Sequence, residues 1–531
     1  SEGLIVGREH ERTAETRLQR APTWMWWMGT SRPVLEAASF RTIEVLEEQL
    51  VFARLCGCYG FRPTSMLRNP TAYCSVVVGL LLTSTPAPAE PAANPATAEE
   101  AAESGEPVAP REKDADRDGN PDVIDVEVRG QRAGRGEEIS PAELQEPRHA
   151  STGDAVAELP GVAVVRRGAG AAEPTIRGLG WERVVTQVGL LPLYGACPGR
   201  MDPPVIYVRP HGVYQLSVIQ ALPSVTLGPA TSGGRILVRP DYERSSPSAE
   251  SIDGWTGWKA DSSRRGFAGD GGVRGALGPF DFSAGAEAIR MHDYRSPSGA
   301  QIPARQGEWS MSESLAYHPS EGHRLWHALS YVHHDEMSYP ALPMDLERTD
   351  YWQVHGGYRY RGEANVREAS LELGLMDADH EMGNRSKPNR PTLHAHTAST
   401  SRAYAGRAAA VLSLGPAGAL RTGVDATALE RDALRTRNLQ SVGSHFEDPI
   451  WPDASQTQRG LFGEWTSPRW HDLELRAGGR IDSWRQRIRK ADAPGLGGRP
   501  VREGYAAFYG GDAADVVQSD LLGAANALLS W

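Results

Sequence analysis

Cysteine, methionine and histidine side chains occur in this sequence at spacings that could hold a soft metal ion. Cys197 and Met201 stand four residues apart around a Pro-Gly turn, and His380 and Met382 stand two residues apart far downstream. A thiolate, two thioethers and an imidazole together favour Cu(I) over hard cations such as Mg²⁺ or Ca²⁺. If the fold brings the two pairs together, these four residues form a copper site.

Ordinary packing is the alternative for these sulfur atoms. Cys197 could be a small buried hydrophobe, and the two methionines could simply fill space around it. Met337 and Met344 also lie near His333-His334, in a segment expected to be a loop. They could act as transient sulfur contacts for an incoming ion, or they could be ordinary loop residues.

Export from the cytoplasm is predicted from residues 66–89. This segment has a short basic start at 66–68, an apolar stretch at 74–82 and a small-x-small cleavage site at 87–89. The arrangement is typical of a secretory signal peptide and is too short to span a bilayer. We therefore expect residues 1–65 to be an upstream extension and Met66 to be the initiator. The alternative is an unusual N-terminal extension of the mature chain.

The composition agrees with export. The chain has four cysteines in 531 residues, and three of them lie at or before the signal segment, so Cys197 has no disulfide partner after cleavage. The net charge of −11 argues against a nucleic-acid-binding protein. No later run reaches eighteen consecutive apolar residues, and we expect no membrane-spanning helix.

Two regions follow the signal segment before the composition changes again. Residues 90–120 are rich in Ala, Pro, Glu and Asp and are expected to form a disordered linker. Residues 121–242 are expected to form a compact mixed α/β domain, with a capped helix at Ser151–Leu159 that Pro160-Gly161 ends. The predicted strands are Val123–Val128, Val162–Arg167, Arg183–Val188, Gln215–Ile219 and Arg235–Arg239.

Three ordered motifs in this domain resemble the plug domain of the TonB-dependent outer-membrane receptors. The helix ends in Leu159-Pro160-Gly161-Val162, a strand ends in Ile176-Arg177-Gly178, and the domain closes with a Gly-x-x-x-x-Gly-Gly-x-Ile-x-Val segment at 228–238. The resemblance implies a plug domain inside a transmembrane antiparallel β-barrel, located in the outer membrane of a Gram-negative bacterium.

Residues 243–531 fit the barrel part of this resemblance. Segments such as His323–Val332, Tyr351–Tyr360 and Leu473–Ile481 alternate between polar and apolar residues and are separated by turn residues. Successive side chains on a strand point to opposite faces, as a lipid-facing barrel with a wet lumen requires. Aromatic residues at the strand ends could form interfacial girdles, with Trp352, Trp465 and Trp470 as candidates.

Only about twelve such strands can be counted, whereas the receptor family closes its barrel with 22. An open half-barrel would leave an unpaired edge in lipid, which is very unfavourable. We therefore expect the chain to be a C-terminally incomplete receptor, with the barrel only partly present in 243–531. The alternative is a smaller natural barrel, although one of about twelve strands would hardly have room for a plug.

A narrower resemblance concerns the metal ligands. The stretch 195–204 closely resembles the plug loop of copper-importing TonB-dependent receptors, which bind copper through a CxxxM pair and an HxM pair. These pairs correspond to Cys197, Met201, His380 and Met382. The resemblance implies copper import, with Cu(I) as the expected ion, powered by TonB. TonB would add a strand near Val123–Val128, unless that segment is instead the first plug strand.

The sequence shows no catalytic constellation and is not expected to be an enzyme. It has no nucleophile elbow, phosphate-binding loop or HExxH pattern. The expected function is a TonB-dependent receptor that imports copper, with TonB, outer-membrane lipid and the copper ion as partners and no nucleic acid. Two alternatives remain: a siderophore or cobalamin receptor of the same fold, and a truncated outer-membrane barrel protein that does not transport.

Overall fold

The computed structural model describes most of the chain after residue 136. The described ranges are 137–140, 151–168, 170–220, 224–240, 250–440, 443–471, 473–511 and 515–530. They all belong to one of the two compact units into which the chain divides, while the other unit is residues 26–125. The expected extension at 1–65, signal peptide at 66–89, linker at 90–120 and strand at Val123–Val128 lie outside the described residues.

Residues 137–240 form a small mixed domain, as the sequence predicts. Its five-stranded sheet has the order β1-β6-β7-β4-β5, in which β4 and β7 run parallel, and β2 and β3 form a separate hairpin. The elements are β1 (Glu137–Ile139), α5 (Thr152–Val156), β2 (Val162–Arg166), β3 (Ala172–Ile176), η2 (Trp181–Arg183), β4 (Val184–Val188), β5 (Leu191–Pro192), η3 (Pro204–Tyr207), η4 (Pro210–Gly212), β6 (Val213–Ile219), η5 (Val225–Leu227) and β7 (Gly234–Pro240).

The sequence motifs of the small domain fall at its turns. Ser151 caps α5 by accepting the backbone N–H of Asp154, and the helix ends at Val156, earlier than predicted. Gly161 has a φ of +77°, which lets the chain reverse before β2. Gly234 has a φ of +116°, and a Cβ there would lie 2.5 Å from the Ile219 carbonyl oxygen. Both glycines are therefore required by the backbone.

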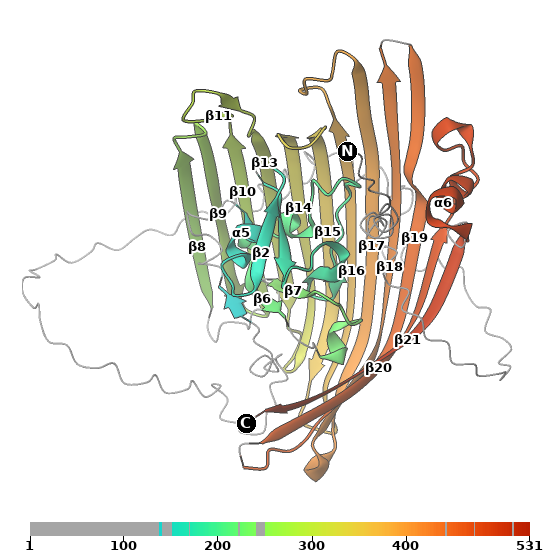
Figure 1. Cartoon of the computed structure of the whole chain (residues 1–531). Coiled ribbons are helices and arrows are strands. Elements are labelled where there is room, and N and C mark those ends of the chain that lie inside the picture. The colour runs from blue at the N-terminus through green and yellow to red at the C-terminus, as the bar shows by residue number, and fades with distance from the viewer. Residues whose placement is uncertain are drawn as a thin grey trace, which may run out of the picture. The chain divides into compact units, whose positions relative to one another are not determined.

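Twelve strands of the chain form one antiparallel sheet, the number counted from the sequence (Figure 1). They pair in chain order, with β8 and β21 as the outer strands of that order. The strands are β8 (Ser251–Asp261), β9 (Gly266–Leu277), β10 (Phe280–Met291), β13 (Gln306–Tyr317), β14 (His323–Met337), β15 (Asp345–Arg361), β16 (Val366–Gly383), β17 (Leu393–Ser413), β18 (Ala419–Leu439), β19 (Ser444–Thr466), β20 (Glu474–Ile488) and β21 (Val517–Ser530).

Short elements occupy some of the connections in this sheet. A two-stranded hairpin, β11 (Tyr294–Arg295) with β12 (Gln301–Ile302), lies between β10 and β13. The β20–β21 connection contains η8 (Leu496–Gly498) and α6 (Val501–Tyr509), and η7 (Gly415–Ala417) joins β17 to β18. No helix among the described residues is long and apolar enough to cross a membrane.

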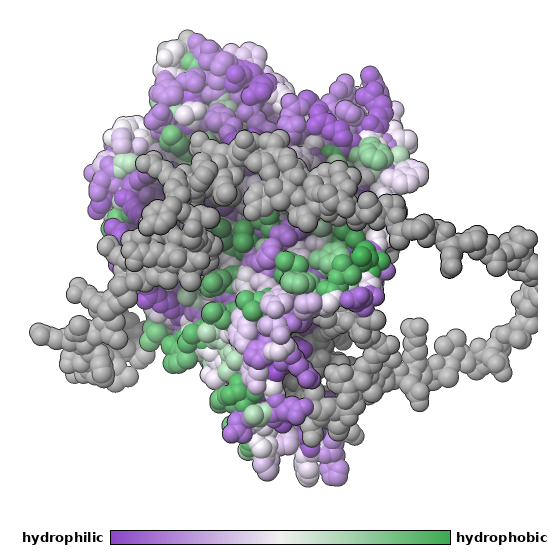
Figure 2. All heavy atoms as spheres, turned by 180° about the vertical axis from the view of Figure 1, so that it is seen from behind, coloured by the Kyte–Doolittle hydropathy of each residue, from purple (hydrophilic) through white to green (hydrophobic). Residues whose placement is uncertain are grey.

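One face of the large sheet carries an apolar row. Directly paired residues point to the same side of a sheet, and one outward row runs across seven consecutive strands. The row is Leu325, Tyr358, Leu371, Ala408, Val424, Leu461 and Ile481. Its leucines, valine and isoleucine are about half exposed. In Figure 2 hydrophobic patches lie across the middle of the molecule and hydrophilic side chains dominate its upper part. An apolar band between polar ends is the surface that a lipid-facing sheet requires.

The opposite face of the sheet packs against the small domain. A second row, on the face opposite the apolar row, contains His334, Thr349, His380 and Ser399 in direct register, and all four side chains are buried. One hydrophobic core includes residues of both parts, for example Leu216 of β6 and Tyr351 of β15. The small domain and the sheet therefore share a core.

The prediction of a loop around His333-His334 is wrong. His333, His334 and Met337 belong to β14, and Met344 follows in the connection to β15. The continuous register of β14 with β15 explains the extended strand, because His333 and His334 pair directly with Asp350 and Thr349. Trp352 lies on the outward face, where its ring is 4.3 Å from that of Tyr331.

Replacing Gly234 by alanine tests the backbone requirement in the small domain. We expect Gly234→Ala to lower the Tm of the purified protein, because a residue with a side chain in this conformation is strained by about 1–3 kcal/mol and its Cβ meets the Ile219 carbonyl oxygen. The matched control is Gly463→Ala in β19, where a Cβ has no atom within 4 Å. Equal Tm values for the two variants would contradict the expectation.

Candidate functional site

A buried carboxylate shapes the loop that carries Cys197. The two oxygens of Asp202 accept the backbone N–H groups of Ala196 (2.6 Å) and Cys197 (2.9 Å). The hydroxyl of Tyr207 also donates to Asp202, at 2.6 Å. Inside this closed loop the N–H of Arg200 donates to the Cys197 carbonyl at 3.0 Å. The loop therefore has its conformation fixed before any ion binds.

Contacts at both ends of the loop hold it between the small domain and the sheet. The guanidinium of Arg200 forms ion pairs with Glu173 of β3 and with Glu182 of η2. The hydroxyl of Tyr339, in the connection between β14 and β15, donates to the carbonyl of Met201. The loop is thus tied to the large sheet through the backbone of one of the expected ligands.

His380 and Met382 lie near the end of β16 and point to the same face, as their spacing predicts. Glu381 between them points to the opposite face, where it pairs with Arg348 at 2.7 Å. On the inward side Nδ1 of His380 lies 2.8 Å from the hydroxyl of Thr349, its direct partner on β15. This contact orients the imidazole.

The structure brings one member of each pair into contact. Sγ of Cys197 lies 3.6 Å from Sδ of Met382, although the residues are 185 positions apart. Met201 belongs to the same core as these two residues. All four side chains are buried, with exposed fractions of 2% for Cys197, 2% for Met201, 1% for His380 and 5% for Met382. Nε2 of His380 is buried without a hydrogen-bond partner, so it has a lone pair to offer to a ligand.

The surroundings of Cys197 keep its thiol protonated when no metal is bound. Burial raises the pKa of Cys197, and the neighbouring Asp202 carboxylate raises it further. The backbone N–H groups of Met201 and Gly199 and the charge of Arg200 act in the opposite direction. A metal ion that binds the sulfur as thiolate must therefore displace a proton. The enclosed, water-poor environment and the sulfur donors favour a soft cation.

A second group of potential ligands lies on the other face of the same strands. Single ligand atoms of Glu347, Glu381 and His396 lie within 4.8 Å of one another and are half-buried. Both carboxylates already form ion pairs, Glu347 with Arg385 and Glu381 with Arg348. These carboxylate oxygens are harder ligands than the sulfur atoms of Cys197, Met201 and Met382. Because arginines already pair with them, they are also less available to a metal ion.

Several residues around the cluster were not identified from the sequence. Asp202 lies inside the loop motif, but only the folded loop reveals its bonds to the backbone. Thr349 and Tyr207 contact the site from β15 and η3, and no local pattern indicates which strands pair with β16. Met337 and Met344 were considered as transient sulfur contacts: Met337 is fully buried in the shared core and Met344 packs against it. That role for them stays a prediction.

Comparisons with known proteins identify the small domain. Residues 133–235 match the TonB-dependent Receptor Plug Domain family. No curated protein sequence matches the chain.

Solved structures share the fold of both parts. The structure titled "Copper transporter OprC" has a TM-score of 0.63 and 20% sequence identity, over 74% of this chain and 60% of its own. The unliganded ferric citrate transporter FecA has a TM-score of 0.51 at 14% identity, over 75% of this chain and 60% of its own. The FrpB iron transporter from Neisseria meningitidis has 0.52 at 12%, over 74% of this chain and 63% of its own.

The chain spans about 60% of the length of these structures. At such low identities the likeness concerns the fold: a plug domain packed against the antiparallel strands of an outer-membrane barrel, of which this chain contains a part. The plug match at 133–235, the twelve antiparallel strands and the apolar outward row lead to one conclusion. Residues 133–235 belong to the TonB-dependent receptor plug domain family, and the antiparallel sheet packed against them has the fold of solved outer-membrane transporters.

Proposed function

We propose that this receptor imports copper across the outer membrane and binds it as Cu(I) through Cys197, Met201, His380 and Met382. The observation that carries the proposal is the contact of 3.6 Å between the sulfur atoms of Cys197 and Met382. One sulfur belongs to the plug and the other to the sheet. An ion held between them would join the two parts of the receptor, and movement of the plug would break the ligand set.

The chemistry of the cluster supports a bare soft ion as cargo. Two thioethers contribute little to Zn²⁺ binding but stabilise Cu(I), and one thiolate with one imidazole makes a poor zinc site. Nε2 of His380, which has no hydrogen-bond partner among the described residues, supplies a free lone pair. The structure titled as a copper transporter has the same fold, which agrees with this cargo.

A siderophore or cobalamin receptor needs a wide pocket for a large ligand. The four expected ligands are instead at most 5% exposed and packed in a common core. This enclosed geometry favours an ion over a chelate. The alternative of a barrel protein that does not transport predicts that the protein binds no copper, and the first experiment below tests it.

TonB is the proposed energy source. Among the described residues β1 is the edge strand of the plug sheet, and three of its residues pair with β6. A force applied to the chain before β1 would act first on this short edge pairing. TonB engages such receptors by strand addition, so the N-terminal region of the plug is the proposed contact.

Loss of the thiol should abolish copper binding. We expect purified wild-type protein to retain one Cu(I) per chain after copper loading and desalting, and to discriminate against Zn²⁺. Cys197→Ala should retain almost none, because it removes the only anionic ligand. His380→Ala should have an intermediate effect, and Met201→Ala should have a smaller one. Metal analysis of the loaded proteins measures these contents.

The matched control uses two methionines on one face of β16. Leucine has nearly the volume of methionine, so packing is largely kept. Met382→Leu should weaken copper binding, whereas Met376→Leu should not, because the sulfur of Met376 accepts the backbone N–H of Tyr194. Equal copper content in wild-type and Cys197→Ala protein would exclude Cys197 as a ligand.

The hydroxyl of Thr349 should contribute through the orientation of His380. We expect Thr349→Val to weaken copper binding by about 10- to 100-fold, the usual effect of losing a hydrogen bond to a ligating histidine. Thr397→Val is the control, since Thr397 is equally buried on β17, directly opposite Met382, and its hydroxyl has no hydrogen-bond partner. Competition titration with a Cu(I) chelator measures both affinities. Similar affinities for the two variants would argue against an orienting role for Thr349.

A further inference from the structure

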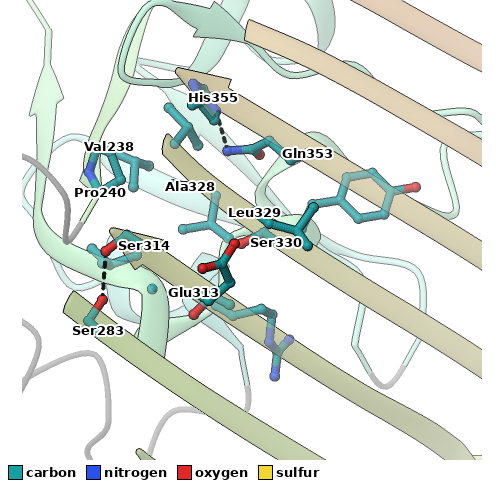
Figure 3. A pocket seen from close by; sticks show the side chains of 17 residues that line it. Val238, Pro240, Ser283, Glu313, Ser314, Ala328, Leu329, Ser330, Gln353 and His355 are labelled. Atoms are coloured by element: carbon teal, nitrogen blue, oxygen red, sulfur yellow. Dashed lines mark hydrogen bonds between the residues drawn. The ribbon is translucent and has the colours of Figure 1, made fainter. Parts of the chain in front are cut away.

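A small polar cavity lies between the plug and the large sheet. It has a volume of about 40 Å³, which is room for a few water molecules. From the plug side Tyr207, Arg209 and Gly212 line it. The polar side chains that the sheet contributes include Ser312 and, labelled in Figure 3, Ser283, Glu313, Ser314, Ser330, Gln353 and His355.

Tyr207 touches both this cavity and the loop that carries Cys197. The hydroxyl of Tyr207 bonds Asp202 of the Cys197 loop, while the same side chain lines the cavity. Its ring stacks on that of Tyr351, with centroids 4.0 Å apart and planes 8° from parallel. The stacked pair therefore lies against both the Cys197 loop and the cavity.

Strand β15 places a row of hydrogen-bonding side chains on the inward face. Thr349 contacts His380, and Tyr351 follows two residues later. The hydroxyl of Tyr351 donates to the side-chain oxygen of Gln353 at 2.7 Å. The amide of Gln353 lies 2.6 Å from Nε2 of His355 (Figure 3). Alternate residues of one strand thus lead from the sulfur cluster to the cavity.

We propose that this cavity receives the ion that leaves the Cys/Met/His site, with His355 as its first nitrogen ligand and the stacked Tyr207–Tyr351 pair as the partition. This assignment rests on the proposed copper import. The donors change from sulfur to oxygen (hydroxyl, amide and the Glu313 carboxylate) and imidazole. Hydroxyl oxygens hold Cu(I) weakly, so the ion can pass through the cavity without being trapped in it.

The chain connectivity links this partition to the edge strand. The segment after Asp202 forms η3 with Tyr207, then η4, and continues directly into β6. β6 is the partner of β1. Removing β1 from the sheet edge therefore frees one side of the strand whose preceding residues form the cavity wall. Tyr207 in that wall donates a hydrogen bond to Asp202 of the Cys197 loop.

Filling the cavity tests the proposal. Ser330 on β14 lines the cavity and pairs directly with Gln353. We expect Ser330→Leu to leave the copper content of the purified protein unchanged while copper accumulation by cells expressing it falls on the order of tenfold. Ser370→Leu is the control, because Ser370 lies on β16 on the same face as Met376 but outside the cavity. It should change neither quantity.

The outcomes separate this proposal from the copper proposal. Normal accumulation with Ser330→Leu would overturn the cavity as the receiving site and leave copper binding intact. Wild-type protein without bound copper would overturn both proposals. If Ser330→Leu is absent from the outer membrane, His355→Leu decides: retained copper content with reduced accumulation supports the receiving site, and unchanged accumulation overturns it.

Discussion

The two-residue period of a β-strand is the constraint on which this receptor depends. Because alternate side chains point to opposite faces, β16 can present Leu371 to lipid and His380 to the plug without any irregularity between them. The same alternation lets Glu381 form an outward ion pair while its two neighbours face inward. A single strand thus carries its candidate ligands on one face and its apolar outward residues on the other.

Two groups of buried charges attach the plug to the sheet. Arg209 lies between Glu287 of β10 and Glu308 of β13. On the other side Arg480 pairs with Asp425 and Asp482 and donates to the plug carbonyl of Val225.

Such buried pairs add little net stability, because desolvation offsets most of the attraction, but breaking one leaves an unpaired charge. They define where the plug sits. The sulfur atoms can therefore meet at a fixed separation.

Much of the fold could be predicted from the sequence, because it depends on local patterns. The alternation of polar and apolar residues indicated twelve strands, and short motifs such as Leu159-Pro160-Gly161-Val162 marked the plug turns. The two ligand pairs were also visible, since each pair lies within one short segment. That the two pairs would lie close together was implied only by the family resemblance. The sulfur atoms of Cys197 and Met382 are 3.6 Å apart in the structure. Strand spacing alone does not determine which part of the plug faces β16.

What could not be predicted depends on register and on loop conformation. The contact of Thr349 with His380 requires the pairing of β15 with β16, which turns and loops far from both residues determine. The role of Asp202 requires a closed loop in which one carboxylate binds two backbone N–H groups. His333 and His334 looked like loop residues because polar residues surround them. Strand pairing overrides that local preference.

The short pairing of β1 with β6 determines which part of the plug would separate first under force. Three described residue pairs hold this strand, whereas the Cys197 loop is held by a carboxylate, two ion pairs and a tyrosine. If the chain before β1 were pulled, the weakest connection would break first. β1 would then separate from β6 before the Cys197 loop moved. An ion bound by both Cys197 and Met382 would crosslink the plug to strand β16. The protein with bound ion would then resist mechanical unfolding of the plug more strongly than the empty protein. A partner that pulls on the N-terminal segment would meet a different resistance in the two states.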